Sequence, residues 1–193
     1  MYRTKTGGLI NSKKVLNFSF NGKKLIGFEG DTLSSALLGN GIHLVGRSFK
    51  YHRPRGIFTS GSEEPSALVQ LDEKKFTEPN IRATTVKLFD GLVANSQNHF
   101  GSLSWDFMRI NDYLSNFLSA GFYYKTFMWP KAFWEKVYEP IIRNAAGLGK
   151  LSKEPDPSIY DKGFLHCDLL VIGAGPSGLY SALIAARTGA KVI

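Results

Sequence analysis

The sequence predicts an α+β domain at the N-terminus, then a helical, aromatic-rich connector, then the beginning of a parallel α/β domain. Three observations support this prediction. Residues 14–29 have a hairpin pattern, residues 99–149 hold aromatic side chains with helical spacing, and residues 168–178 place a glycine-rich turn after an apolar strand. We therefore expect domains over residues 1–95, 96–163 and 164–193.

Residues 14–29 read as a β-hairpin. Two apolar runs flank Asn21-Gly22, a dipeptide that favours a two-residue turn because both residues tolerate a positive φ. Alternating apolar residues on either side then face one core. The first run holds Val15, Leu16, Phe18 and Phe20, and the second holds Leu25, Ile26 and Phe28.

A short helix is expected after the hairpin. Asp31 or Thr32 can cap its N-terminus, residues 33 and 36–38 are apolar with helical spacing, and residues 39–41 (GNG) end it. Residues 66–71 and 82–89 are two further strand candidates. A hairpin, a short helix and more strands is the element order of a β-grasp domain, the fold of plant-type ferredoxins.

Cys167 is the single cysteine of the chain. A ferredoxin-type iron–sulfur cluster needs four cysteine thiolates and a disulfide needs two. We therefore predict that the N-terminal domain is ferredoxin-like in fold but cluster-free, and that the chain has no internal disulfide. Cys167 begins a predicted strand, where we expect it to be a small buried hydrophobe.

Basic and aromatic side chains alternate in residues 46–56 (GRSFKYHRPRG). This pattern can indicate contact with nucleic acid, an anionic ligand, or arginines that dock on carboxylates and carbonyls of the same protein or of another subunit. Residues 1–60 carry the whole net charge of +8, and residues 61–193 balance 14 basic with 14 acidic residues. Because no nucleic-acid fold motif is present, we expect docking and no nucleic-acid partner.

Residues 99–149 are predicted to be largely helical. Ser104 can cap a helix, and aromatic residues continue through residues 121–130 and 133–142. Aromatic rings at this density are typical of a surface that buries against another domain or subunit, with a membrane surface as the less favoured alternative. A polar linker with two prolines follows at residues 150–163. The apolar positions after Ser104 are Phe107, Ile110, Leu114, Phe117 and Leu118.

The chain ends in a dinucleotide-binding pattern. Residues 168–172 read as a buried parallel strand, residues 177–188 as a helix stopped by Gly189, and residues 191–193 as a second strand. Between them the glycines of G-x-G-x-x-G permit the tight turn, the approach of a pyrophosphate and close helix–strand packing. The helix N-terminus favours phosphate. The predicted cofactor-binding residues are Gly173, Ala174, Gly175, Pro176, Ser177 and Gly178.

The glycines alone do not distinguish NAD from FAD. The acidic residue that grips a ribose lies about 20 residues beyond the motif, at or past Ile193. No residue is a candidate catalytic base or nucleophile, and the four histidines (His43, His52, His99 and His166) show no spacing for a triad or a metal site. No apolar run reaches membrane-helix length and no signal region follows the N-terminus, so we expect a cytoplasmic protein.

Several longer strings resemble the N-terminus of α subunits of the heterotetrameric sarcosine oxidase family. They cover nearly the whole chain and are more specific than the glycine motif. They are residues 30–42 (GDTLSSALLGNGI), 46–56, 63–65 (EEP), 121–130 (GFYYKTFMWP), 138–149 (YEPIIRNAAGLG) and 166–178 (HCDLLVIGAGPSG).

This resemblance implies a subunit of a flavoenzyme complex with β, γ and δ partner subunits. In that family, sarcosine is demethylated at a flavin on the β subunit, and electrons reach oxygen through a second flavin, giving hydrogen peroxide. The complex holds FAD and FMN, and the methyl carbon passes to tetrahydrofolate in the C-terminal half of α. The α subunit holds NAD on its glycine loop, where Ser177 stands in place of a frequent alanine. Family α subunits continue for several hundred residues, so we expect this chain to be a fragment.

Two alternatives remain open. The chain can belong to the corresponding subunit of an opine, proline or cyanide-forming amino-acid dehydrogenase, although cluster-bearing members need cysteines that residues 1–166 lack. It can also be a non-catalytic docking module, because one strand and one helix do not bury both faces of a parallel sheet. On either view we expect the isolated chain to be inactive.

Overall fold

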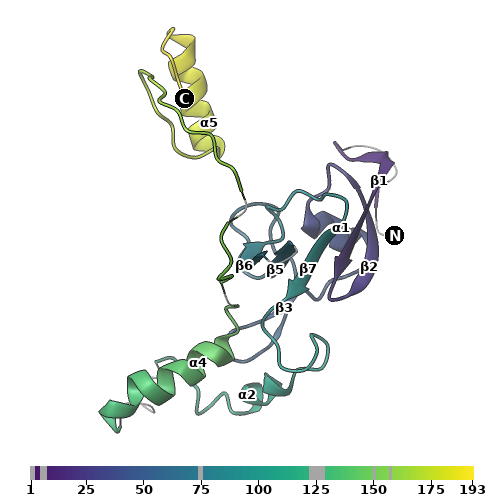
Figure 1. Ribbon diagram of the computed structural model, residues 1–193, viewed down its shortest axis with the longest axis vertical. Helices are drawn as coiled ribbons and strands as arrows, with labels where there is room; N and C mark the ends of the chain where they lie inside the picture. The colour runs from purple at the N-terminus through teal and green to yellow at the C-terminus, as the bar shows by residue number, and fades with distance from the viewer. Residues whose placement is uncertain (1–2, 5–7, 74–75, 122–128, 150, 157) are drawn as a thin grey trace. The chain divides into compact units, whose positions relative to one another are not determined.

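The computed structural model describes residues 3–4, 8–73, 76–121, 129–149, 151–156 and 158–193 (Figure 1). The chain forms two compact units, Met1–Pro155 and Asp156–Ile193. The division falls inside the linker predicted at residues 150–163. Each unit is described separately below.

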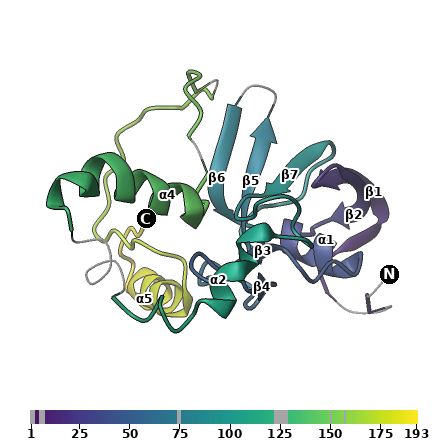
Figure 2. The same cartoon turned by 90° about the horizontal axis from the view of Figure 1, so that it is seen from below.

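A five-stranded mixed sheet is the framework of the first unit. Its strands are β1 (Asn11–Phe20), β2 (Lys23–Glu29), β5 (Leu68–Glu73), β6 (Phe76–Arg82) and β7 (Leu92–Ser96), in the order β2-β1-β7-β5-β6. β1 and β7 are parallel, and the other neighbours are antiparallel. Figure 2 shows β6, β5 and β7 side by side. The predicted β-grasp order of a hairpin, a helix and further strands is present.

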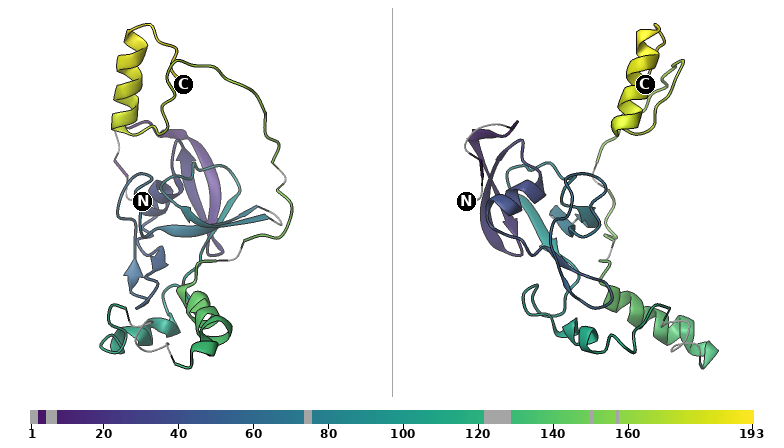
Figure 3. Two further views of the ribbon diagram at one scale, coloured as in Figure 1. Left: turned by 90° about the vertical axis from the view of Figure 1, so that its left-hand side faces the viewer. Right: turned by 180° about the vertical axis from the view of Figure 1, so that it is seen from behind.

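The hairpin prediction is confirmed. Phe20 pairs with Lys23, and Asn21 and Gly22 form the turn with φ of 50° and 76°. Positive φ at both turn residues matches the right-handed twist of the two strands. Figure 3 shows the resulting curved ribbon, with helix α1 (Leu33–Gly39) beside it.

Thr32 caps helix α1, which resolves the choice between Asp31 and Thr32. The Thr32 hydroxyl accepts from the Ser35 amide, and the Ser35 hydroxyl accepts from the Thr32 amide, forming a capping box. Asp31 instead accepts two hydrogen bonds from Arg3 and one from the Phe28 amide. Helix and sheet enclose a core whose largest members are Leu33, Leu37, Val45, Val69 and Leu92.

The strand predicted at residues 82–89 is wrong. Residues 83–91 form turns and irregular segments, and the flanking strands β6 and β7 carry the pairing. Ala83 and Val86 offer their carbonyls to the amides of Ser34 and Leu33 at the start of α1. These backbone groups therefore serve the helix terminus instead of a strand ladder. Strand β5, by contrast, overlaps the strand predicted at residues 66–71.

The connector has shorter helices than predicted. A 3₁₀ turn (Phe107–Arg109) leads into α2 (Ile110–Tyr113), and the cap is Asp106, not Ser104. Phe107, Ile110 and Phe117 are exposed, so no core holds a longer helix over this apolar stripe. A second helical stretch runs from η2 (Lys131–Phe133) through η3 (Trp134–Tyr138) to α4 (Glu139–Ala146). Most of the predicted aromatic string at residues 121–130 lies outside the described residues.

Unit two contains helix α5 (Pro176–Arg187), which begins and ends one residue before the predicted 177–188. The predicted strands at residues 168–172 and 191–193 meet as a parallel bridge between Leu169 and Val192. The Val171 amide donates to the Ile193 carbonyl at 2.8 Å, and the Ile193 amide donates to the Leu169 carbonyl at 3.1 Å. A strand, a helix and a parallel return therefore occur in the predicted order.

Two short strands complete the elements. β3 (Gly46–Arg47) and β4 (Pro54–Arg55) pair antiparallel and close the base of the loop at residues 46–56. No helix within the described part of the chain is long and apolar enough to cross a membrane.

Candidate functional site

The glycine turn of the second unit has a geometry that only glycine permits at two positions. Gly173 has a φ of +114°, which side chains disfavour. A Cβ on Gly178 would lie 2.0 Å from the Gly173 carbonyl oxygen and 3.4 Å from Cγ1 of Val171. Gly173 thus makes the turn and Gly178 lets α5 approach the strand, as the motif predicts.

Gly175 differs from these two because it faces open space. It is the N-cap of α5, has a φ of −74°, and no atom lies within 4 Å of the place where its Cβ would be. No side chain caps the helix, and Pro176 follows at its first turn. The first amides of α5 are therefore available to an anion that comes close to the Gly175 backbone. Phosphate binding by residues 173–178 stays a prediction.

The second unit leaves much of its apolar surface uncovered. Ile172 is 91% exposed, and Leu170 and Leu179 are exposed by more than half. Asp168 does not face the turn, because its Oδ2 accepts from the Lys191 amide at 2.8 Å. A parallel strand is ordinarily buried on both faces, so this unit has the shape of one βα step that further strands and helices would cover.

A buried ionic cluster lies in the first unit, where the sequence predicted no site. Nδ1 of His52 is 2.6 Å from Oδ2 of Asp106, and Nε2 is 3.1 Å from the Ala145 carbonyl oxygen. The side chains of His52 and Asp106 are fully buried. The two ring nitrogens of His52 therefore link the Asp106 carboxylate to the Ala145 carbonyl.

Burial alone would raise the pKa of Asp106. The Phe100 amide, the His52 ring and the Met108 amide all donate to this carboxylate and outweigh burial. The pKa of Asp106 therefore lies below its ordinary range. Asp106 is therefore ionised at neutral pH.

Arg47 extends the cluster without a carboxylate partner. Its Nε and Nη2 donate to the Leu103 carbonyl at 2.9 and 2.7 Å, and its Nη1 donates to the His52 carbonyl at 3.1 Å. The guanidinium is buried and donates to carbonyl groups of two segments. Its contacts hold the loop at residues 46–56 against residues 103–104.

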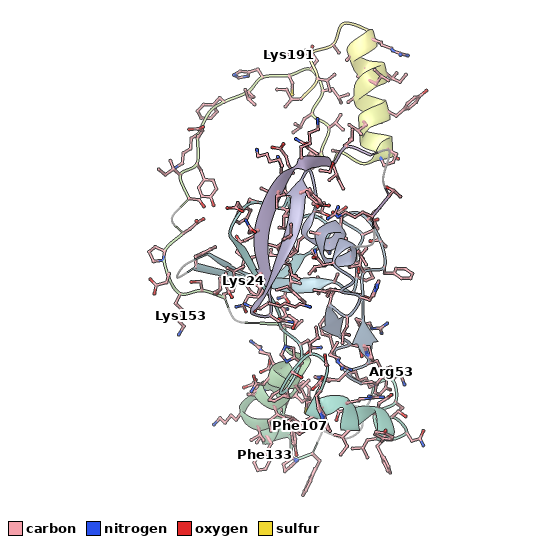
Figure 4. The ribbon with its side chains drawn as sticks, turned by 90° about the vertical axis from the view of Figure 1, so that its right-hand side faces the viewer. Lys24, Arg53, Phe107, Phe133, Lys153 and Lys191 are labelled. Atoms are coloured by element: carbon pink, nitrogen blue, oxygen red, sulfur yellow. The ribbon has the colours of Figure 1, made fainter. Side chains whose placement is uncertain are left out.

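Arg53 and Lys50 of this loop also make contacts within the chain, which agrees with the internal form of the predicted docking. Arg53 forms an ion pair with Asp112 at 2.7 Å, and its guanidinium lies 4.8 Å from the centre of the Tyr51 ring. The Tyr51 hydroxyl donates to the Leu118 carbonyl at 2.9 Å. Figure 4 shows Arg53 near the helical end of the unit, where it meets α2.

Glu64 is a second buried carboxylate that the sequence did not identify as special. Its two oxygens accept from the backbone amides of Phe58, Thr59, Ser66 and Ala67. Burial would raise the pKa of Glu64, but these four amides outweigh it and hold the pKa below its ordinary range. Glu64 can be recognised as a special carboxylate only from its four backbone donors, and the sequence does not reveal them.

The histidines do not form a metal site. No group of three or more histidine, cysteine, aspartate or glutamate side chains with metal-binding geometry occurs over the ranges that the structure describes. His52 is already engaged on both ring nitrogens.

The chain is similar to known proteins, both over residues 13–99 and over nearly its whole length. Residues 13–99 match the family described as 2Fe-2S iron-sulfur cluster binding domain. The chain is 59% identical over 192 residues to the sarcosine oxidase subunit alpha of Rhizobium meliloti (strain 1021), covering 100% of this chain and 20% of that protein. It is 33% identical over 190 residues to the sarcosine oxidase subunit alpha of Corynebacterium sp. (strain U-96), covering 97% of this chain and 15% of that protein.

Among solved structures, L-proline dehydrogenase from P. horikoshii aligns with 49% of this chain and 16% of its own, at 30% identity and a TM-score of 0.36. The chain thus spans about a fifth of the length of the curated relative it matches at 59% identity. The chain belongs with the alpha subunits of sarcosine oxidase and corresponds to their N-terminal part.

Proposed function

We propose that this chain is the N-terminal part of the NAD-binding alpha subunit of a flavin-dependent sarcosine oxidase. The observation that carries the proposal is the 59% identity, over all of this chain, to a sarcosine oxidase subunit alpha. The reaction is the conversion of sarcosine, tetrahydrofolate and oxygen to glycine, 5,10-methylenetetrahydrofolate and hydrogen peroxide. FAD and FMN belong to the assembled complex, with β, γ and δ partner subunits.

Within this subunit, the role proposed for residues 173–178 is to hold the pyrophosphate of NAD. The turn at Gly173, the open approach at Gly175 and the close packing at Gly178 support this role. Ser177 follows Pro176 in the first turn of α5, so its hydroxyl can donate to a phosphate oxygen.

We further propose that the ferredoxin-like domain carries no iron–sulfur cluster. Residues 13–99, which match the cluster-binding family, contain no cysteine. Thiolates are the ordinary ligands of such clusters. Arg47 and His52, in the loop at residues 46–56, donate to groups of the chain itself. The donor set does not fit a [2Fe–2S] cluster, and the domain serves here as a scaffold for the connector.

The test uses the complete alpha subunit that contains this sequence, co-expressed with its partner subunits. We expect the purified complex to hold one equivalent of NAD, to hold no iron, and to release hydrogen peroxide with sarcosine. The assay includes proline and an opine as alternative substrates. A complex that contains no dinucleotide and leaves sarcosine untouched would contradict the proposal, and preferential oxidation of proline or the opine would assign it to the dehydrogenase alternative.

A further inference from the structure

We propose that a notch on the aromatic face of the connector is the docking site for a neighbouring subunit. The notch receives an apolar side chain that stands next to a carboxylate on that subunit. This inference rests on the proposed function, because it assumes that the chain works within an assembly of subunits. We call the feature the Trp105–Tyr113 notch and define it by Trp105, Phe107, Arg109, Ile110 and Tyr113.

The notch combines apolar walls with full access to solvent. Its volume is about 320 Å³, room for one large side chain. Phe107 is 75% exposed, and Trp105, Ile110 and Tyr113 are also mostly exposed. The rings of Trp105 and Phe107 stack with centroids 6.0 Å apart and planes 22° apart. Exposed aromatic side chains gathered in one place are typical of the core of a protein interface.

The backbone under the notch is held in place by the buried cluster. Asp106, between Trp105 and Phe107, accepts from the amides of Phe100 and Met108 and from His52. The Phe107 amide donates to the Phe100 carbonyl at 3.1 Å. These contacts fix the segment before any partner arrives. A preformed site loses less conformational entropy on binding, so the same contacts give a higher affinity.

Arg109 supplies the charge preference of the notch. The two carboxylates nearest to it in sequence are already engaged, Asp106 by His52 and Asp112 by Arg53. Within the described residues, the Arg109 side chain has no carboxylate partner. A guanidinium beside aromatic walls pairs well with a carboxylate that adjoins an apolar side chain.

The charge of the chain and the names of its relatives together favour another subunit as the partner that fills the notch. The chain carries a net charge of +8, and Arg109 is the cation that lines the notch. A basic surface selects an acidic partner and repels a second copy of itself. The relatives at 59% and 33% identity are each named as a subunit, so in those proteins a different chain is at hand.

The experiment is site-specific photocrosslinking in the complete complex. A photoreactive benzoylphenylalanine replaces Phe107 in the full-length alpha subunit, and the complex is purified with its partners. Phe58 receives the same group as the control, since it is a phenylalanine of matched exposure (80%) outside the notch. After illumination, mass spectrometry identifies the crosslinked peptides. Sarcosine oxidation by the same preparation is measured first.

We expect Phe107 to crosslink to a peptide of another subunit that contains an aspartate or glutamate, with a yield at least about tenfold above that at Phe58. We also expect Arg109→Glu to raise the Kd for the partner about tenfold, because it places like charges together. Crosslinks only to later residues of the same chain, to a second alpha subunit, or to nothing in an active complex would overturn the notch proposal alone. Failure to assemble or to oxidise sarcosine would instead contradict the proposed function, and the notch proposal with it.

Discussion

At the scale of single residues, His52 and Asp106 determine how the connector attaches to the sheet domain. His52 belongs to the loop at residues 46–56, Asp106 to the segment before α2, and Ala145 to α4. The His52 side chain therefore joins three segments that are far apart in sequence. Arg47 adds hydrogen bonds from the same loop to the Leu103 carbonyl, just before Asp106 in the chain. The buried charges are stabilising here because each one has acceptors or donors in place.

Glu64 gives a direct test of a carboxylate held by backbone amides. Glu64→Gln replaces one accepting oxygen with an NH₂ group, which faces amides that also donate. We expect it to lower the free energy of unfolding by about 2–3 kcal/mol, the cost of buried donors left unpaired. Urea unfolding followed by circular dichroism measures the change. Glu63→Gln is the control, since Glu63 is exposed; equal effects of the two substitutions would contradict the role of Glu64.

The depressed pKa of Asp106 predicts acid sensitivity. A carboxylate whose pKa is lower in the folded than in the unfolded state stabilises the fold above its unfolded pKa of about 4, and this contribution is lost as the pH falls through the folded pKa. We expect the urea midpoint to fall as the pH drops from about 5 towards about 3. Asp106→Asn should be less stable at pH 7 and show a shallower fall; an unchanged slope would contradict this assignment.

At the scale of elements, two glycines of the turn have different roles: one allows close packing and the other leaves room for a ligand. Gly178 is in contact with the turn itself, whereas Gly175 faces open space. Helix α5 follows directly and carries Pro176 at its start, where a missing amide costs no hydrogen bond. The two glycines therefore predict different outcomes when a methyl group is added.

Gly178→Ala is expected to destabilise the second unit by about 1–3 kcal/mol, because its Cβ would overlap the Gly173 carbonyl. Gly175→Ala is expected to leave folding unchanged and to reduce the NAD content of the full-length subunit, since the methyl group occupies the path of the pyrophosphate. Thermal unfolding and dinucleotide content of the purified subunit distinguish them. Wild-type NAD content in Gly175→Ala would exclude close approach at this glycine.

At the scale of the whole molecule, the second unit begins with a segment that has no regular secondary structure. Residues 158–166 contain no helix or strand, and Ile159, Tyr160 and Phe164 are exposed. The ferredoxin-like unit, by contrast, encloses its core between the mixed sheet and α1. A protease should therefore cut the exposed segment at residues 158–166 before it cuts the core of the first unit.

Limited digestion of the chain with chymotrypsin is expected to cut first at Tyr160 or Phe164, because an exposed segment without secondary structure enters a protease readily. Phe18 and Phe20, buried in β1, should resist cleavage over the same time. Mass spectrometry of the early products tests this order. Early cuts within β1 would show that the first unit opens more easily than its core indicates.

Local sequence patterns determined the elements that depend on a few neighbouring residues. The Asn21-Gly22 turn, the capped helix α1, and the order of strand, glycine turn and α5 were all predictable, because positive φ, capping and close packing are local requirements. The absence of cysteines from residues 13–99 is likewise a property of the sequence. The resemblance to sarcosine oxidase alpha subunits also came from the residues alone.

Tertiary structure decided what depends on distant partners. Residues 82–89 were predicted to form a strand, yet the Ala83 and Val86 carbonyls serve the start of α1. The apolar stripe after Ser104 forms only a short helix because no core covers it. His52 becomes distinctive only through Asp106 and Ala145, which lie far along the chain. Glu64 accepts from nearby amides, but they converge on it only in the folded loop, which has no regular secondary structure. No sequence period could reveal either site.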